Sequence, residues 1–280
     1  MKAKINRKRI YLNLLTYIIL IVIIFLVGLP IISMVGTALK SSDEVLSSTS
    51  LLPRRFHFES FLYVLDKTTY SRNLANSFLV SICTTVVCVV IASMAGYAVS
   101  RFKSRLFNIY SILVLVLQMF PLVLLLIPLF LIFKFMNLTD TLFSVILSYL
   151  TINLPFSIWM LRGFFNTIPI DIEEAALIDG CSRFRSFAVI ILPISAPGIA
   201  TVGMFTFIFS WKEYMLASIF LRSDSIKTAT LGLQDFITQY DSDWPSLMAA
   251  STMTTIPVII FLVIAQKYLI QGLTAGSVKG

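Results

Sequence analysis

Few residues of this chain could do chemistry, and most of them lie in or beside long apolar runs. The 280 residues include one histidine, His57, and three cysteines, Cys83, Cys88 and Cys181. The cysteines are too few and too unevenly spaced for a disulfide framework or a zinc site. One histidine argues against a histidine metal centre and a Ser-His hydrolase. The sequence has no G-x-x-x-x-G-K-[ST] pattern for ATP and no interfacial cluster of His, Asp or Glu. We therefore expect no catalytic residue, bound metal or cofactor.

The most distinctive polar stretch begins with a short predicted helix at about residues 172–180. Asp171 could act as its N-cap, and Glu174, three residues later, would complete a capping box. The carboxylate of Glu173 would interact favourably with the positive end of the helix dipole. Gly180 supplies a residue that can end a helix in the left-handed conformation. A helix of ~12 Å is too short to be stable alone, so another element must support it. It would present a small apolar face that could seat in a groove, formed by Ile172, Ala175 and Ala176.

A second set of polar residues lies inside apolar runs. Lys212 and Glu213 stand between Trp211 and Tyr214, while Gln118 and Asn153 lie beside prolines. Charges within a membrane usually face a bundle interior or a wet cavity. Adjacent charges on a helix do not share a face, so these two need separate partners or a locally unwound backbone. The alternative is a nearby helix break that lets both charges reach interfacial water. Gln118 and Asn153 could line a transport path or bond a neighbouring helix, and the sequence favours the second role.

Composition places the chain in a bilayer. Hydrophobic residues make up 58% and charged residues 13% of the chain, and the mean hydropathy is +0.90. The first apolar run has ~24 residues, which is too long for the apolar region of a signal peptide. We predict an all-α membrane protein forming a single transmembrane domain over residues 1–280. Its six expected spans are 12–35, 78–99, 109–133, 142–161, 190–221 and 247–265. Ala92 and Gly96 give the second span a pair of small residues suited to close helix contact.

Charge distribution predicts the orientation. Six spans place both termini on one side, and the segments on that side carry more Lys and Arg than the opposite segments. The positive-inside rule makes that side the cytoplasm. Both termini and the helix at 172–180 are therefore expected to be cytoplasmic. The net charge of +8 does not indicate nucleic acid, because the basic residues are scattered rather than gathered on one face.

The polar stretch resembles the EAA motif of bacterial ABC importer permeases. Glu174, Ala175 and Ala176 are followed by three residues, Gly180, nine residues and the Ile-Ile-Leu-Pro run 190–193. In that family this segment is a cytoplasmic coupling helix that docks into the ATPase subunit. The resemblance implies that the contact with the ATPase involves Glu173, Glu174, Ala175, Ala176, Asp179 and Gly180.

The end of the chain narrows the resemblance. The tail from Gln266 to Gly280 resembles the Q-[RK]-[YF]-x-x-x-G-L-x-x-G-x-V-K-G ending of the second permease in maltose-type carbohydrate importers. The runs 211–214 (WKEY) and 243–250 (DWPSLMAA) look like the same group. That group usually has Asn where this chain has Lys212, which puts a substrate role carried over to this position in doubt. The candidate substrate path comprises Trp211, Lys212, Glu213, Tyr214, Gln118 and Asn153.

The resemblance implies a set of partners and a location. They are a second permease, two cytoplasmic ATPase subunits that bind ATP and Mg²⁺, an extracytoplasmic solute-binding protein and a carbohydrate, at a prokaryotic inner or plasma membrane. An ion-coupled secondary transporter is the alternative class, but such proteins often show internal repeats and this sequence shows none. A further alternative is an ABC importer for a non-sugar solute such as a glycerophosphate. The sequence does not name the sugar.

Overall fold

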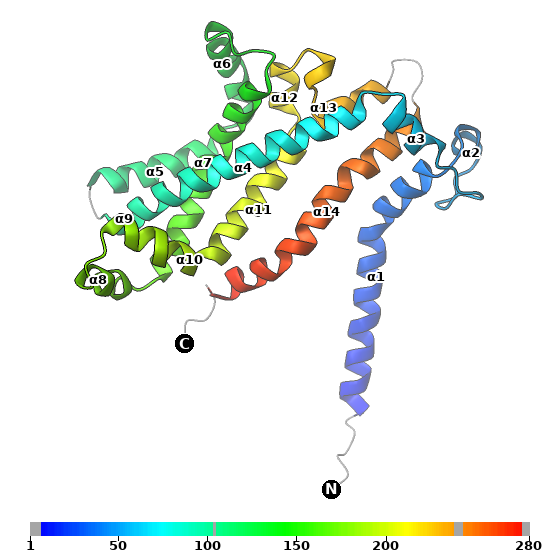
Figure 1. Cartoon of the computed structure of the whole chain (residues 1–280). Coiled ribbons are helices and arrows are strands. Elements are labelled where there is room, and N and C mark those ends of the chain that lie inside the picture. The colour runs from blue at the N-terminus through cyan, green and yellow to red at the C-terminus, as the bar shows by residue number, and fades with distance from the viewer. Residues whose placement is uncertain (1–6, 103–104, 238–242, 276–280) are drawn as a thin grey trace. The chain divides into compact units, whose positions relative to one another are not determined.

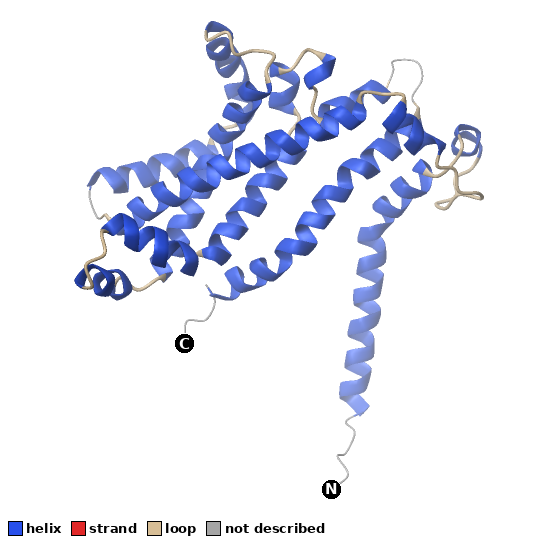
Figure 2. Cartoon of the chain, viewed as in Figure 1, coloured by secondary structure: helices blue, strands red, loops and turns tan. Residues whose placement is uncertain are grey.

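The computed structural model of the chain describes residues 7–102, 105–237 and 243–275. Its regular elements are all helices (Figure 2), as the composition predicts. The chain divides into two compact units, one of residues 1–68 and 235–253 and one of residues 69–234 and 254–280. The expectation of a single permease domain stays a prediction. The last five residues of the tail pattern, 276–280, lie outside the described residues, as do some of the basic residues counted for the orientation.

The first unit contains the first apolar helix and the polar segment that follows it. The apolar side chains of this helix from Leu14 to Val27 are exposed, as expected of a helix that faces lipid or another subunit. Lys40 is buried, and its ammonium donates to the backbone oxygen of Ser50. The elements of this unit are α1 (Arg7–Ala38), α2 (Ser42–Ser47), α3 (Glu59–Asp66) and the first part of α14 (Trp244–Ala275).

The second unit is built on three long helices, α4 (Tyr70–Arg101), α7 (Leu142–Thr167) and α11 (Ala196–Lys212), which pack pairwise along one another (Figure 1). The shorter elements are α5 (Arg105–Met119), α6 (Leu122–Phe135), α8 (Asp171–Ile178), α9 (Arg183–Ser186), the π-helical turn η1 (Phe187–Ile191), α10 (Leu192–Ile194), α12 (Met215–Phe220), the 3-10 turn η2 (Asp224–Ile226) and α13 (Ala229–Gly232). The 3-10 turn η3 (Leu233–Phe236) begins in this unit and ends in the first.

The close contact predicted for the second span is confirmed between α4 and α7. A Cβ added to Gly96 would lie 3.1 Å from the backbone nitrogen of Arg162 and 3.2 Å from the backbone oxygen of Ile158. Ala92, one turn earlier, is fully buried. Small residues at this spacing let two helix backbones approach closely, as is common in membrane bundles.

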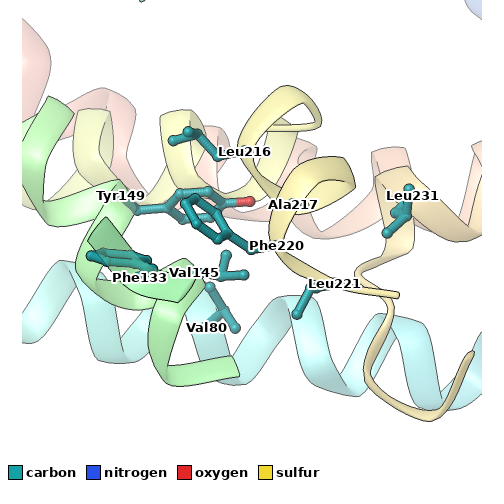
Figure 3. Packing of buried hydrophobic residues seen from close by; sticks show 9 residues of the cluster. All are labelled: Val80, Phe133, Val145, Tyr149, Leu216, Ala217, Phe220, Leu221 and Leu231. Atoms are coloured by element: carbon teal, nitrogen blue, oxygen red, sulfur yellow. The ribbon is translucent and has the colours of Figure 1, made fainter. Parts of the chain in front are cut away.

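Two apolar clusters pack against opposite ends of α7. Near its N-terminal end the α12 cluster (Figure 3) consists of Val80, Phe133, Val145, Tyr149, Leu216, Ala217, Phe220, Leu221 and Leu231. Near its C-terminal end the α7 C-terminal cluster consists of Ala92, Ile158, Leu161, Phe165, Ile168, Phe187, Ile191 and Val202. The second unit therefore has a separate packed region at each end of its central helix.

The helices differ from the predicted spans at breaks within the third and fifth spans. Where a single third span was expected, α5 and α6 meet at an angle of 100° around Phe120 and Pro121, because proline cannot donate the helical N–H bond. The fifth expected segment bends by 77° between Arg183–Ile194 and Ala196–Lys212, beside Pro193 and Pro197. Four helices of the described residues are long and apolar enough to cross a membrane, or up to six if each bent pair is one span.

Candidate functional site

Helix α8 forms where the polar stretch predicted a short helix, but its start differs. The N-cap position is Ile170, which makes no side-chain cap, and Asp171 is the first helical residue. The predicted capping box of Asp171 and Glu174 is therefore wrong. Asp171, Glu173 and Glu174 all lie in the first turn, where their carboxylates interact favourably with the positive end of the helix dipole.

The end of α8 is the one predicted from Gly180. Gly180 has a φ of +84°, in the left-handed region that favours glycine. Its N–H donates to the oxygen of Leu177 at 3.1 Å, and the N–H of Cys181 donates to the oxygen of Ala176 at 3.0 Å. This pair of bonds is a Schellman motif, which satisfies carbonyls that the helix end would otherwise leave unpaired. A Cβ on Gly180 would meet no atom of this chain within 4 Å, so only the backbone conformation requires glycine here.

The apolar face predicted for α8 is not present as a single surface. Ala176 is buried against the chain itself, with 6% of its surface exposed, while Ile172 and Ala175 are exposed. The three residues therefore do not form one docking face, and that prediction is wrong. The exposed side also includes Glu174, Asp179 and Ile178, the last 86% exposed. Together with Ile172 and Leu177, each 37% exposed, Ile178 gives α8 several apolar side chains that the described part of the chain does not cover.

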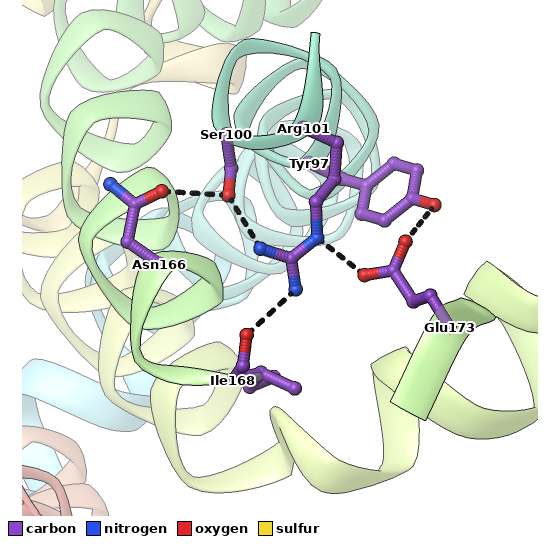
Figure 4. A network of polar contacts seen from close by, with 6 residues as sticks. All are labelled: Tyr97, Ser100, Arg101, Asn166, Ile168 and Glu173. Atoms are coloured by element: carbon purple, nitrogen blue, oxygen red, sulfur yellow. Dashed lines mark hydrogen bonds and ion pairs between the residues drawn. The ribbon is translucent and has the colours of Figure 1, made fainter. Parts of the chain in front are cut away.

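Glu173 is buried because its carboxylate binds two side chains of α4 (Figure 4). Its carboxylate forms an ion pair with the guanidinium of Arg101, the last residue of α4, and accepts a hydrogen bond of 2.9 Å from the hydroxyl of Tyr97. Arg101 also donates to the backbone oxygen of Ile168 at 3.1 Å, at the end of α7. Sequence reasoning placed Glu173 in the ATPase contact and missed Arg101 and Tyr97. The signal for Arg101 was its place at the start of a short basic turn just after a span.

The two neighbouring charges in the fifth expected span are separated by a helix break. Helix α11 ends at Lys212, and α12 begins at Met215. The Glu213 carboxylate accepts hydrogen bonds from the backbone N–H groups of Leu216 at 2.9 Å and Ala217 at 3.2 Å. The locally unwound backbone considered from the sequence is thus present, and Glu213 stabilises the first turn of α12.

The side chain of Lys212 makes a different contact from that of Glu213. Its side chain is exposed, and its ammonium lies 4.5 Å from the ring centroid of Phe209, one turn earlier on α11. This is within the range of a cation–π contact. The ion pairs formed by the described residues do not include Lys212. Lys212 therefore carries a positive charge that no neighbouring carboxylate balances in this part of the chain.

The aromatic neighbours of the break are held in place by hydrogen bonds. Trp211 is 2% exposed, and its indole N–H donates to the backbone oxygen of Thr254 at 3.0 Å. The hydroxyl of Tyr214 accepts a hydrogen bond from the Gln234 amide. Buried Trp usually needs such a partner for its N–H. These bonds give Trp211 and Tyr214 structural roles in positioning the break.

Gln118 and Asn153 do come together, on the wall of one pocket. The pocket has a volume of about 380 Å³ and is also lined by the rings of Phe120, Phe156 and Phe209. The Asn153 amide donates to the oxygen of Tyr149 on its own helix at 2.8 Å and lies 3.5 Å from the hydroxyl of Ser210 on α11. Asn153 thus bonds within and between helices, as the sequence favours, and also borders the pocket.

Comparison with known proteins places the chain in a family. Residues 88–275 match the family described as the binding-protein-dependent transport system inner membrane component. The chain belongs to this family. It is a multi-pass inner-membrane permease subunit of a binding-protein-dependent ABC transporter, a component that is not an enzyme and binds no cofactor of its own.

Individual relatives agree with this assignment. A putative ABC transporter permease of Caldicellulosiruptor is 36% identical over 265 residues, which are 94% of this chain and 96% of the relative. The trehalose/maltose transport system permease MalG of Thermococcus litoralis is 34% identical over 278 residues, 98% of each chain. Among solved structures, a bacterial ABC transporter involved in the import of the acidic polysaccharide alginate has a chain that aligns with a TM-score of 0.81 at 21% identity, covering 96% of this chain and 99% of that one. This likeness shows the ABC importer permease fold.

Proposed function

We propose that this chain is one of two permeases of an ATP-driven sugar importer and that α8 couples it to an ATPase subunit. The observation that carries the proposal is the construction of α8. A glycine at φ +84° ends the helix, an ion pair fastens it to α4, and its other side is left exposed. A helix of eight residues held in this way can pass a displacement of a bound partner to the bundle behind it.

The proposal includes the remaining components of the importer. The family description supports an extracytoplasmic solute-binding protein. Two cytoplasmic ATPase subunits supply the energy of ATP. A companion permease forms a heterodimer with this chain. Closure of the ATPases moves α8 and switches the permeases between inward-facing and outward-facing states. Both termini and α8 lie on the cytoplasmic side, as the distribution of Lys and Arg predicts.

A sugar is the substrate class that the relatives and the pocket support. The trehalose/maltose permease is similar over 98% of this chain. The pocket beside Gln118 and Asn153 combines aromatic rings with amide groups, which suits a ring with apolar C–H faces and hydroxyl edges. We place the substrate path along this pocket and past the break from Trp211 to Tyr214.

One observation favours a second candidate, an anionic solute such as a glycerophosphate. Lys212 is exposed and lies over Phe209, whose ring lines the same pocket. Lys212→Asn distinguishes the two: uptake of an anionic solute should fall, while uptake of a neutral sugar should persist. If Lys212→Asn changes neither, Lys212 lies away from the substrate path.

Gly180 gives the test of the coupling role. Gly180→Val forces a β-branched residue into a positive φ, at a backbone cost on the order of 1–3 kcal/mol. Gly180→Asn is the matched control, since Asn tolerates this conformation and the added Cβ meets no atom of this chain. We expect Gly180→Val to insert normally but to lose ATP-driven uptake and retain the ATPase subunits poorly. Gly180→Asn should keep more of both. Normal uptake and normal ATPase retention in Gly180→Val would show that α8 is not a coupling helix.

The orientation has its own test. Cys181, next to Gly180, is partly exposed, and labelling it in a background without Cys83 and Cys88 reports the side on which α8 lies. A membrane-impermeant maleimide should reach Cys181 only from the cytoplasm. Labelling from outside intact cells would contradict the proposed topology.

A further inference from the structure

We propose that Arg101 and Glu173 are positioning residues that transmit the movement of α8 to α4 and α7. Loss of the pair would leave ATP hydrolysis intact but disconnect it from the opening of the substrate path. This inference rests on the proposed function of α8 as a coupling helix, and goes beyond it by naming the connection inside the permease. Arg101 is the last residue of α4 and Glu173 lies in the first turn of α8, 72 positions apart in the sequence.

The Arg101 guanidinium joins three elements at one point (Figure 4). Its Nε pairs with Glu173 of α8, and one terminal nitrogen donates to the oxygen of Ile168 at 3.1 Å, the residue after α7. The other terminal nitrogen lies 3.3 Å from the hydroxyl of Ser100, which donates to the Asn166 side chain of α7 at 2.8 Å. A displacement of Glu173 therefore acts through one rigid, planar group on the ends of both long helices.

Little else ties α8 to α4. The backbone of α8 packs closely on α9, whereas the polar contacts between α8 and α4 in the described part of the chain run through Arg101 and Tyr97. Beside the pair lies a pocket of about 210 Å³, lined among others by Tyr97, Glu173 and Ser186. Because this space is not filled by apolar side chains, dispersion contacts between α8 and α4 are limited there.

The pair is shielded enough to hold its geometry. The Arg101 and Glu173 side chains are only 7% and 11% exposed. A surface ion pair breaks and re-forms freely in water, whereas a buried pair with additional hydrogen bonds keeps its partners in place. Removal of one partner leaves a buried charge, while neutralising both leaves none. This difference allows the transmission of movement to be separated from folding.

The test uses the assembled transporter in lipid nanodiscs and needs no sugar. Gln118→Cys places a thiol on the wall of the pocket, and a membrane-impermeant maleimide added with or without MgATP and vanadate reports its opening. The signal of the parent without this cysteine is subtracted. ATPase retention and ATP hydrolysis are measured in the same preparations. The variants are Glu173→Gln, Arg101→Gln and the double variant Arg101→Gln with Glu173→Gln. Asp171→Asn is the control, a first-turn carboxylate of the same helix that is exposed.

We expect nucleotide to raise the labelling rate in the parent and in Asp171→Asn. In the double variant this increase should fall about 5-fold or more, the lower end of measured coupling between sites, while ATP hydrolysis and ATPase retention persist. The double variant should lose no more than either single variant, because the two residues act as one unit. A normal nucleotide response in the double variant, or losses that add, would overturn the inference. No nucleotide response in the parent itself would instead contradict the proposed function.

Discussion

The two ends of α7 use carboxylates differently. At the C-terminal end Glu173 pairs with a side chain of another helix, Arg101 of α4. At the N-terminal end two carboxylates accept backbone N–H groups instead. Asp140, just before α7, bonds the N–H groups of Arg222 at 2.8 Å and Ser223 at 3.0 Å, and Glu213 bonds those that begin α12.

The difference separates a fixed connection from one that can transmit movement. A carboxylate that accepts backbone N–H groups fixes the local course of the chain, because those groups cannot turn independently of it. An ion pair between side chains on different helices connects two helices, so that a displacement of one is passed to the other. We infer that the end with Asp140 and Glu213 is the rigid part of the second unit and that the end with Glu173 is the part that moves.

The largest loss of stability is expected when one partner of the buried Arg101–Glu173 ion pair is removed. Arg101→Ala leaves the Glu173 carboxylate buried without its partner, which should destabilise the second unit by about 3–5 kcal/mol. Thermal unfolding in detergent should show a marked loss of Tm. Arg105→Ala, a change of an exposed arginine at the start of α5, is the control and should unfold like the parent. Equal unfolding of both variants would mean that the pair contributes no stability.

The next largest loss of stability is expected at the N-terminal end of α7. Glu213→Ala removes the acceptor for the N–H groups of Leu216 and Ala217 and should cost about 1.5–3 kcal/mol, the range for hydrogen bonds to charged groups. Because this bond fixes a local turn, the nucleotide response of the labelling assay should persist once the protein is folded. A folded Glu213→Ala variant that lost that response would remove the distinction between the two ends.

A smaller effect is expected from Tyr97→Phe. This change deletes the hydroxyl that donates to Glu173 at 2.9 Å but keeps the ion pair and the ring contact with Phe187, whose centroid lies 4.6 Å away. The loss of stability should be about 1 kcal/mol. The nucleotide response should be weakened less than in the Arg101→Gln variant. A greater loss than in Arg101→Gln would shift the connection from the arginine to the tyrosine.

The smallest effect is expected at Asp140, and it depends on pH. Hydrogen bonds from the Ser223 hydroxyl and from the backbone N–H groups of Arg222 and Ser223 hold the pKa of Asp140 below its ordinary value of 3.8. A lowered pKa means that the carboxylate stabilises the folded state above pH 3.8 and that this stabilisation is lost as the pH falls through the folded pKa. Asp140→Asn should therefore lower the Tm slightly at pH 7 and not at all well below pH 3.8. A Tm difference that stayed constant across this range would contradict the role of the charge.

Sequence reasoning predicted features whose cause is local. Gly180 was predicted to end α8 because few residues other than glycine adopt a positive φ easily. Ala92 and Gly96 were predicted to let two helices approach, and apolar runs predicted the long helices. In each case a residue type at a given spacing allows only a few structures.

The remaining features depend on which distant residues meet. Nothing local distinguishes Glu173 from Glu174, yet one is buried on Arg101 and the other is exposed. Asp171 could not be recognised as the first helical residue, because Ile170 adopts helical dihedral angles and moves the cap back by one position. The break after Lys212 was one of the alternatives that the sequence left open. It depends on the hydrogen bonds that the Glu213 carboxylate accepts from the backbone N–H groups at the start of α12.

The central claim, that α8 is the surface on which an ATPase subunit docks, is tested most directly by cross-linking. Ile178, 86% exposed on α8, is replaced by a photoreactive phenylalanine derivative, and Ser225, exposed in η2, is replaced in the same way as the control. After irradiation of the assembled transporter in membranes, Ile178 should form a cross-link with the ATPase subunit and Ser225 should not. If the probe at Ser225 captures the ATPase and the probe at Ile178 does not, α8 is not the docking surface.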